Sequence, residues 1–247
     1  MKKLSILISV AGVLCAPALQ AALQVTLTQN TALYSYGNGG EFRASGSVIA
    51  GVNPTLWGYS PATAQGGVGA YFQTFCIETS EYFSPGVAYN ISLNSRAMYG
   101  GQFPNGDPIS IGTAWLYSQF AAGTLVGLDA LNNPVAYNYA YGPGRTLSAG
   151  ALQQAIWWLE GEAVDPGNTD AFRNAVIAQF GSAAAAEVDA NGAYGVLVLN
   201  LWDKNTGAVA QDQLILVPEP TTVLAGLLLL LPLGASTIRI LRKNHSS

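Results

Sequence analysis

The chain has 247 residues, with ten Lys and Arg against fourteen Asp and Glu, which gives a formal net charge of −4. Five of the ten basic residues lie at the two ends, so residues 22–217 keep five basic and thirteen acidic residues and a net charge of −8. An acidic segment of this kind is a poor nucleic-acid ligand, because neutralising phosphates requires Lys and Arg. We therefore expect no nucleic-acid partner.

The positions of His and Cys limit the catalytic chemistry. The single His, His245, lies near the C-terminus, and one of the two cysteines, Cys15, lies near the N-terminus. Between them only Cys76 remains, which excludes a Ser-His-Asp triad, a Cys-His protease and a Cys/His zinc site in that segment. We expect no cofactor and no metal. The roughly 200 intervening residues suffice for one domain with a core of its own.

The N-terminus has the pattern of a secretory signal peptide. Lys2 and Lys3 precede an apolar stretch at residues 4–19, and small residues then continue to Ala21. This order predicts cleavage near Ala21 and export of the rest, so residues 1–21 are assigned as a signal peptide. A lipoprotein signal at Cys15 is the weaker alternative, since a bulky leucine precedes this cysteine where a small residue is needed.

The middle of the chain predicts strands at both ends and helices between them. Hydrophobic alternation and helical spacing identify the elements. Strands are predicted at residues 23–28, 41–49 and 70–78, helices at 109–122, 147–162 and 169–180, and a final β-hairpin at 194–202 and 208–217. Residues 129–144 are expected to form a loop, and Ser148 to cap the second helix. The predicted fold class is α+β, with a sheet or sandwich and a central helical subdomain over residues 22–217.

The C-terminus combines a short motif, an apolar run and a basic end. Pro218, Glu219 and Pro220 precede the almost wholly apolar residues 221–238, which are followed by basic residues up to position 243. An 18-residue helix is about 27 Å long, enough for one transmembrane helix. The order resembles the PEP-CTERM sorting tail of Gram-negative bacteria, here residues 218–243. The resemblance implies an exosortase-type sorting protease as partner, transient anchoring in the inner membrane, and a final place at the cell surface or in the extracellular matrix.

Cys76 lies in one of two short motifs that occur in a suggestive order. The first is Phe75-Cys76-Ile77-Glu78, and the second runs from Leu152-Gln153 to Trp157. The pair resembles the thioester domains of bacterial surface adhesins. That resemblance implies an internal thioester between the Cys76 sulfur and the Gln153 side-chain carbonyl. The family pattern has Thr where this chain has Leu152, and Gln154 is the fallback partner.

A thioester is an electrophile stored on the protein, and it reacts once. The resemblance implies covalent attachment to a surface-protein amine or a polysaccharide hydroxyl, by a protein that is not an enzyme. Lys204 is the single Lys of residues 22–217, a scarcity that would limit attack by the protein on itself and that compositional drift explains equally well. The alternative is a non-covalent structural or carbohydrate-binding matrix protein in which Cys76 is a small buried hydrophobe.

Four acidic residues near the two motifs are expected to be solvent-exposed charges without a catalytic role. Glu78 and Glu81 are interpreted as solvated charges at a strand edge, with a role in tuning the thiol or shaping the entrance to the site as the alternative. Glu160 and Glu162 are interpreted as surface charges, because residues two apart on a helix do not face each other. They therefore do not form the carboxylate pair of a glycoside hydrolase.

Overall fold

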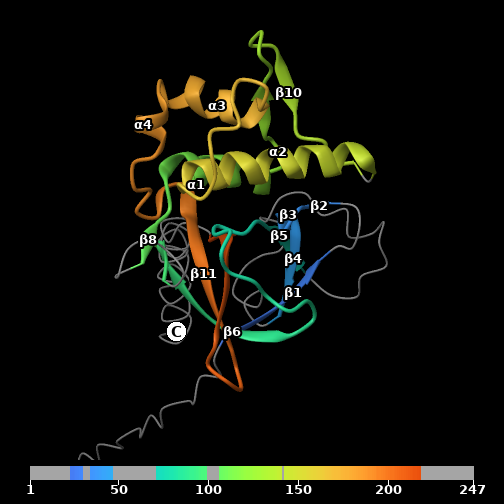
Figure 1. Cartoon of the computed structure of the whole chain (residues 1–247), viewed down its shortest axis with the longest axis vertical. Coiled ribbons are helices and arrows are strands. Elements are labelled where there is room, and N and C mark those ends of the chain that lie inside the picture. Colours follow the sequence, from blue (N-terminus) through green and yellow to red (C-terminus); the bar gives the residue numbers. More distant parts are fainter. Residues whose placement is uncertain (1–22, 30–33, 47–70, 99–105, 141, 218–247) are drawn as a thin grey trace, which may run out of the picture.

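The computed structural model describes residues 23–29, 34–46, 71–98, 106–140 and 142–217 (Figure 1). The predicted signal peptide and sorting tail, with Pro218, Glu219 and Pro220, lie outside these residues and stay predictions. No helix in the described part of the chain is both long and apolar enough to cross a membrane.

Most of the strands form one six-stranded antiparallel sheet, in the order β12-β11-β6-β1-β4-β5. These strands are β1 Gln24–Gln29, β4 Phe42–Ser45, β5 Tyr71–Thr74, β6 Ala88–Asn94, β11 Val196–Asp203 and β12 Val209–Leu216. The shorter pairs are β2 Ser35–Tyr36 with β3 Gly39–Gly40, β7 Arg96–Ala97 with β8 Asp107–Pro108, and β9 Val126–Leu128 with β10 Pro134–Ala136.

The chain that directly follows β5 joins the two edges of the sheet. The backbone N–H of Ile77 donates to the Asp212 carbonyl at 3.2 Å, and the N–H of Leu214 donates to the Phe75 carbonyl at 3.1 Å. Cys76, which lies between these two bonds, therefore bridges to Gln213 of β12 in antiparallel orientation. These bonds hold the backbone on both sides of Cys76 in place.

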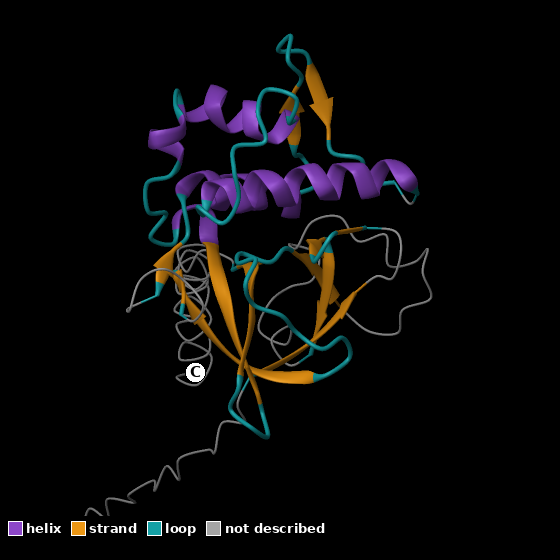
Figure 2. Ribbon diagram, in the orientation of Figure 1, coloured by secondary structure: helices purple, strands orange, loops and turns teal. Residues whose placement is uncertain are grey.

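The four α-helices of the described residues gather on one side of the sheet, and α2 crosses over the ends of the strands (Figure 2). They are α1 Ile111–Ala121, α2 Pro143–Leu159, α3 Ala171–Phe180 and α4 Ala183–Ala186. Side-chain caps fix the starts of three of them, α2 being the exception: the Ser110 hydroxyl accepts from the N–H of Thr113 at α1, and Asp170 and Ser182 cap α3 and α4. Gly181 ends α3 in the left-handed conformation, with a φ of 84°.

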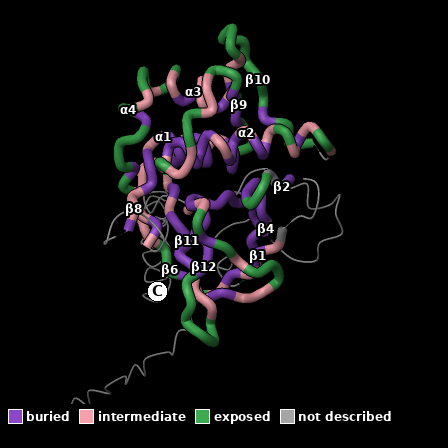
Figure 3. The backbone as a smooth tube through the Cα atoms, viewed as in Figure 1, coloured by how far each residue is buried: buried purple, intermediate pink, exposed green. Residues whose placement is uncertain are grey.

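Two hydrophobic cores hold the layers together. The larger lies between the helices and the sheet and includes Leu116, Leu152 and Ile156, all fully buried. The smaller is formed by strand residues such as Leu27 and Leu199. Buried backbone concentrates where α1 and α2 meet the strands, while the tip of the β9–β10 hairpin is exposed (Figure 3). Helix α2 packs against α1, α3 and the β2–β3 pair.

The predicted order of strands, helices and strands is confirmed, and three details of the prediction are wrong. Helix α2 begins at Pro143, and Ser148 does not cap it but accepts from the Asn138 N–H at 3.0 Å. The predicted loop at residues 129–144 contains strand β10. Strand β6 was not predicted, although it lies between β11 and β1 near the middle of the sheet.

Candidate functional site

The structure brings Cys76 and Gln153 together, 77 positions apart in the chain. The Cys76 Sγ and the Gln153 Oε1 are 3.4 Å apart, and the Gln153 amide nitrogen donates to the Cys76 backbone carbonyl at 2.8 Å. Both residues are fully buried. The two contacts fix the plane of the amide, so that its carbonyl end faces the sulfur.

A backbone donor completes the hydrogen bonding of this amide. The N–H of Gly40, at the end of β3, donates to the Gln153 Oε1 at 3.1 Å. Gly40 has a φ of 105°, a backbone conformation that residues other than glycine rarely adopt. A donor on the carbonyl oxygen stabilises the negative charge that develops there when a nucleophile attacks the carbon.

The neighbouring Gly39 lets α2 approach β3 closely. A Cβ atom built on Gly39 would lie 2.6 Å from two ring carbons of Trp157 and 2.8 Å from the Gln153 Cγ. Real Cβ atoms essentially never come this close to other atoms. Sequence analysis predicted no strand at Gly39–Gly40, and the packing of α2 on this strand is a tertiary contact.

Aromatic side chains cover the pair. Trp157 lies one helical turn after Gln153 and packs with Phe42 on Cys76, and Phe83 packs against this cluster. Burial raises the pKa of the Cys76 thiol, the nearby Trp157 N–H opposes this shift, and the charges of Glu78 and Glu162 add to it. The sulfur is therefore a neutral thiol at neutral pH and is shielded from water.

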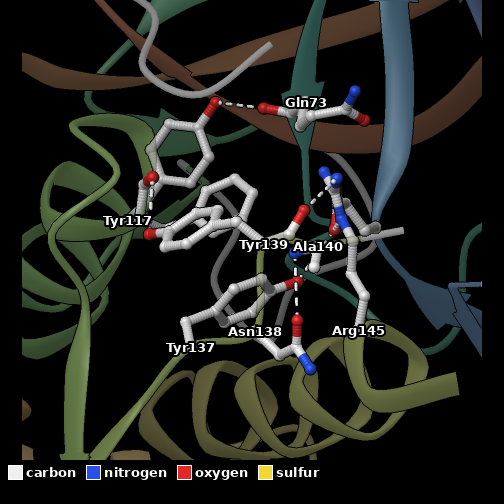
Figure 4. Close-up of polar contacts among 9 residues, drawn as sticks. Gln73, Tyr117, Tyr137, Asn138, Tyr139, Ala140 and Arg145 are labelled. Atoms are coloured by element: carbon white, nitrogen blue, oxygen red, sulfur yellow. Dashed lines mark hydrogen bonds and ion pairs between the residues drawn. The ribbon is translucent and has the colours of Figure 1, made fainter. Parts of the chain in front are cut away.

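A buried ion pair holds the Gly39–Gly40 strand against α2. Arg145, in the first turns of α2, forms a bidentate pair with Glu41, the residue after Gly40, and its Nε lies 2.9 Å from a Glu41 oxygen. The Tyr137 hydroxyl donates to the same carboxylate at 2.8 Å, and Arg145 also donates to the Tyr139 carbonyl at 3.0 Å (Figure 4). This network positions the Gly40 donor over Gln153. Sequence reasoning missed it, because Glu41 and Arg145 are far apart in the chain.

On the other side, Glu162 ties the chain after Cys76 to the end of α2. Its carboxylate accepts from the N–H and the hydroxyl of Thr79, at 2.9 and 2.7 Å. Glu160 accepts from the N–H and the hydroxyl of Ser110 at 3.1 and 2.9 Å, and so supports the cap of α1. The prediction that both are simple surface charges is wrong, since both are half-buried and hydrogen-bonded.

The geometry distinguishes Gln153 from the two neighbours that the sequence left in question. Gln154 is half-buried on a different face of α2, whereas Gln153 makes the contacts to Cys76. Leu152, which stands where the resembled family has Thr, is fully buried in the larger core. Leu152 therefore anchors this turn of α2 by packing, and Gln153 is the candidate partner of the sulfur.

A small hollow lies on the outer side of the aromatic cover. It has a volume of about 160 Å³ and is lined by Phe42, Phe83, the exposed Tyr82, Asn38 and Gln211, among others. Phe42 and Phe83, which line this hollow, also belong to the cluster that packs around Cys76.

Glu78 and Glu81 do not lie where the sequence suggested. They are 2 % and 9 % exposed, so the prediction of solvated strand-edge charges is wrong. Residues 75–77 pair with β12, and the segment at Glu81 and Tyr82 continues along β12, with the Gln211 N–H donating to the Tyr82 carbonyl at 3.2 Å. Both carboxylates are thereby brought to the buried Asp212.

No family model, curated protein or solved structure matches this chain. Function is therefore inferred from the geometry of the site and from the sequence motifs.

Proposed function

We propose that this protein stores an internal thioester between Cys76 and Gln153 and uses it for covalent attachment to a target outside the cell. The single observation that carries the proposal is the buried contact of 3.4 Å between the Cys76 Sγ and the Gln153 Oε1. A carboxamide with its carbonyl end against the only cysteine thiol of residues 22–217 is the arrangement that thioester formation needs.

Formation of the bond is an acyl transfer from nitrogen to sulfur. The Cys76 sulfur attacks the Gln153 Cδ, the S–C bond forms, the C–N bond breaks, and the thiol proton leaves with the amide nitrogen as ammonia. The Gly40 N–H, 3.1 Å from the Oε1, stabilises the charge on that oxygen during the attack. No oxidant or cofactor takes part.

Opening of the bond transfers the Gln153 acyl group from the Cys76 sulfur to a nucleophile of the target. An amine or a hydroxyl of the target attacks the Gln153 carbonyl carbon, forms an amide or an ester, and releases Cys76 as a thiol. The aromatic cover of Trp157 and Phe42 excludes water, which would otherwise hydrolyse the stored bond. The hollow beside Phe42 and Phe83 is the route by which a target group reaches the carbonyl.

Export would place the thioester where target nucleophiles are present. The predicted signal peptide and PEP-CTERM-like tail would deliver the domain to the cell surface or matrix through an exosortase-type protease. There, surface-protein amines and polysaccharide hydroxyls are abundant nucleophiles. Each molecule reacts once, so the protein acts as a covalent adhesin and not as an enzyme.

The alternative is a non-covalent matrix protein in which Cys76 is only a buried hydrophobe. Burial of a cysteine alone agrees with both functions. The alternative gives no reason for the carbonyl end of a buried amide to face the Cys76 sulfur, although it agrees with an amide whose hydrogen bonds are satisfied. Gln153 makes these hydrogen bonds with Cys76 and Gly40, on the two sides of the proposed bond.

The test is the reaction of the purified protein with methylamine, followed by intact mass and a thiol titration under denaturation. A thioester adds one methylamine per chain and releases one titratable thiol. An unchanged mass, with the Cys76 thiol free from the start, would exclude the thioester.

Two variants make this test specific. Cys76→Ser and Gln153→Ala should each abolish methylamine addition. Gln154→Ala is the matched control, since it removes the same amide one residue further along α2, and it should react as the wild type does. Loss of labelling in Gln154→Ala with retention in Gln153→Ala would assign the bond to the fallback residue.

A further inference from the structure

Three carboxylates meet in a buried cluster close to the seam, the line along which residues 75–77 pair with β12. Glu78, Glu81 and Asp212 each place one oxygen within 4.8 Å of the others. Their residues are 2 %, 9 % and 0 % exposed. Such a concentration of negative charge is costly to bury unless something positive neutralises it.

The cluster has no cationic side chain to neutralise it. Among the described residues, Arg145 pairs with Glu41 and Arg173 with Asp165, and neither pair involves the cluster. Neither oxygen of Glu78 has a hydrogen-bond partner among the described residues, and one Glu81 oxygen also has none. A buried carboxylate without a partner, directed at two others, indicates that a ligand is missing from the site.

We infer that Glu78, Glu81 and Asp212 bind a divalent cation of the calcium type. An all-oxygen set of carboxylates selects hard cations, and it lacks the nitrogen and sulfur ligands that zinc or copper would favour. Calcium lies about 2.4 Å from its oxygen ligands, so one ion can reach oxygens about 4.8 Å apart on opposite sides. Magnesium is less suited, because it demands near-ideal octahedral geometry and usually keeps several waters, whereas calcium tolerates a flexible set of carboxylates.

The three ligands have different parts in this site. Asp212 is held rigidly, since its carboxylate accepts from the N–H of Leu201 at 3.1 Å and from the Asn200 amide at 2.7 Å. Glu78 has both oxygens available for bidentate binding. Glu81, the most exposed of the three, offers the route from solvent.

Binding would fix the segment that carries Cys76. Glu78 and Glu81 belong to the chain that follows Cys76, while Asp212 belongs to β12, so one ion would link the two sides of the seam. The sequence alone gave no sign of this site, because Asp212 joins the two glutamates only on folding. The inference does not depend on the thioester, since no ligand is a residue of the thioester pair.

The test is calcium binding by the purified, chelator-treated protein. Calorimetric titration measures the stoichiometry and affinity, and thermal unfolding measures the effect on Tm. We expect one calcium ion per chain and a rise in Tm that depends on calcium concentration. Glu78→Gln keeps the shape of the side chain but removes its charge, and it should weaken binding by at least about tenfold. Glu187→Gln, at an exposed acid far from the cluster in sequence, is the control and should bind as the wild type does.

Two further comparisons keep the result decisive. Glu81→Gln should also weaken binding, and it replaces Glu78→Gln if that variant does not fold. Cys76→Ser should bind calcium as the wild type does, which separates this inference from the thioester. Absence of stoichiometric calcium binding, or equal binding by Glu78→Gln and wild type, would overturn the inference. Greater stability of Glu78→Gln than wild type at neutral pH, with no calcium effect on either, would assign a shared proton to the cluster instead.

Discussion

Replacement of Gly39 by alanine tests whether close packing of α2 on β3 makes the Cys76–Gln153 contact. The added Cβ would lie 2.6 Å from the Trp157 ring and 2.8 Å from the Gln153 Cγ. Carbon atoms pack at about 3.5–4.0 Å, so the strand and the helix must separate by about 1 Å. This overpacking should cost about 1–3 kcal/mol of stability.

The larger effect is expected on the chemistry. A displacement of about 1 Å at reacting atoms can cost roughly 100-fold in rate. We therefore expect Gly39→Ala to reduce the fraction of chains that methylamine labels at Gln153 by at least about tenfold. Labelling is measured by mass spectrometry on freshly purified protein, and stability by thermal unfolding.

Gly37→Ala provides the matched control in the same turn. Gly37, unlike Gly39, has a positive φ, of 57°, and a Cβ there would meet no atom within 4 Å. This variant should lose about 1–2 kcal/mol through backbone strain and keep wild-type labelling. Wild-type labelling of Gly39→Ala, or equal loss in both variants, would refute the role of the close approach.

Two further predictions concern the surroundings of the site. Arg145→Met leaves Glu41 buried without its partner and should lower the free energy of unfolding by about 3–5 kcal/mol, whereas Arg173→Met breaks a half-exposed pair and should cost about 1 kcal/mol or less. Urea unfolding compares the two, and equal losses would contradict the structural role of Arg145. Burial raises the pKa of Glu160 to about 7 from 4.5, so the folded protein holds this proton more tightly than the unfolded chain does. Its contribution to stability is therefore present below about pH 4.5 and is lost as the pH rises to about 7. Glu160→Gln should flatten the pH dependence of the unfolding free energy in that range, and an unchanged profile would contradict the assignment.

The sequence was sufficient to predict that Cys76 and Gln153 lie side by side, because the information is local. Cys76 and Gln153 each lie in a short motif, and Cys76 is the only cysteine between the two ends of the chain. The main helices were also predictable from their periodicity and end signals, such as Gly181 after α3. Pro143 is a start signal of the same kind for α2 that the prediction overlooked, since proline is favoured in the first helical turn.

The parts that sequence analysis missed depend on contacts between distant segments. Nothing near Gly39 or Gly40 in the chain indicates that Trp157 and Gln153 pack on them. Glu78 and Glu81 have the sequence pattern of an exposed edge, and only the pairing of their segment with β12 buries them. Strand β6 differs, because its alternating burial at Tyr89 and Ile91 is a periodic signal that local analysis could have found.

The covalent state of the Cys76 sulfur tests the central claim most directly. The measurement is peptide mapping of the purified protein without prior exposure to amines, compared with the same protein after methylamine treatment. We expect a linked peptide that contains Cys76 and Gln153 and is short by one ammonia, replaced after treatment by a free Cys76 peptide and a methylamide on Gln153. Two separate peptides before treatment, with an unmodified Gln153 amide and a free Cys76 thiol, would contradict the thioester.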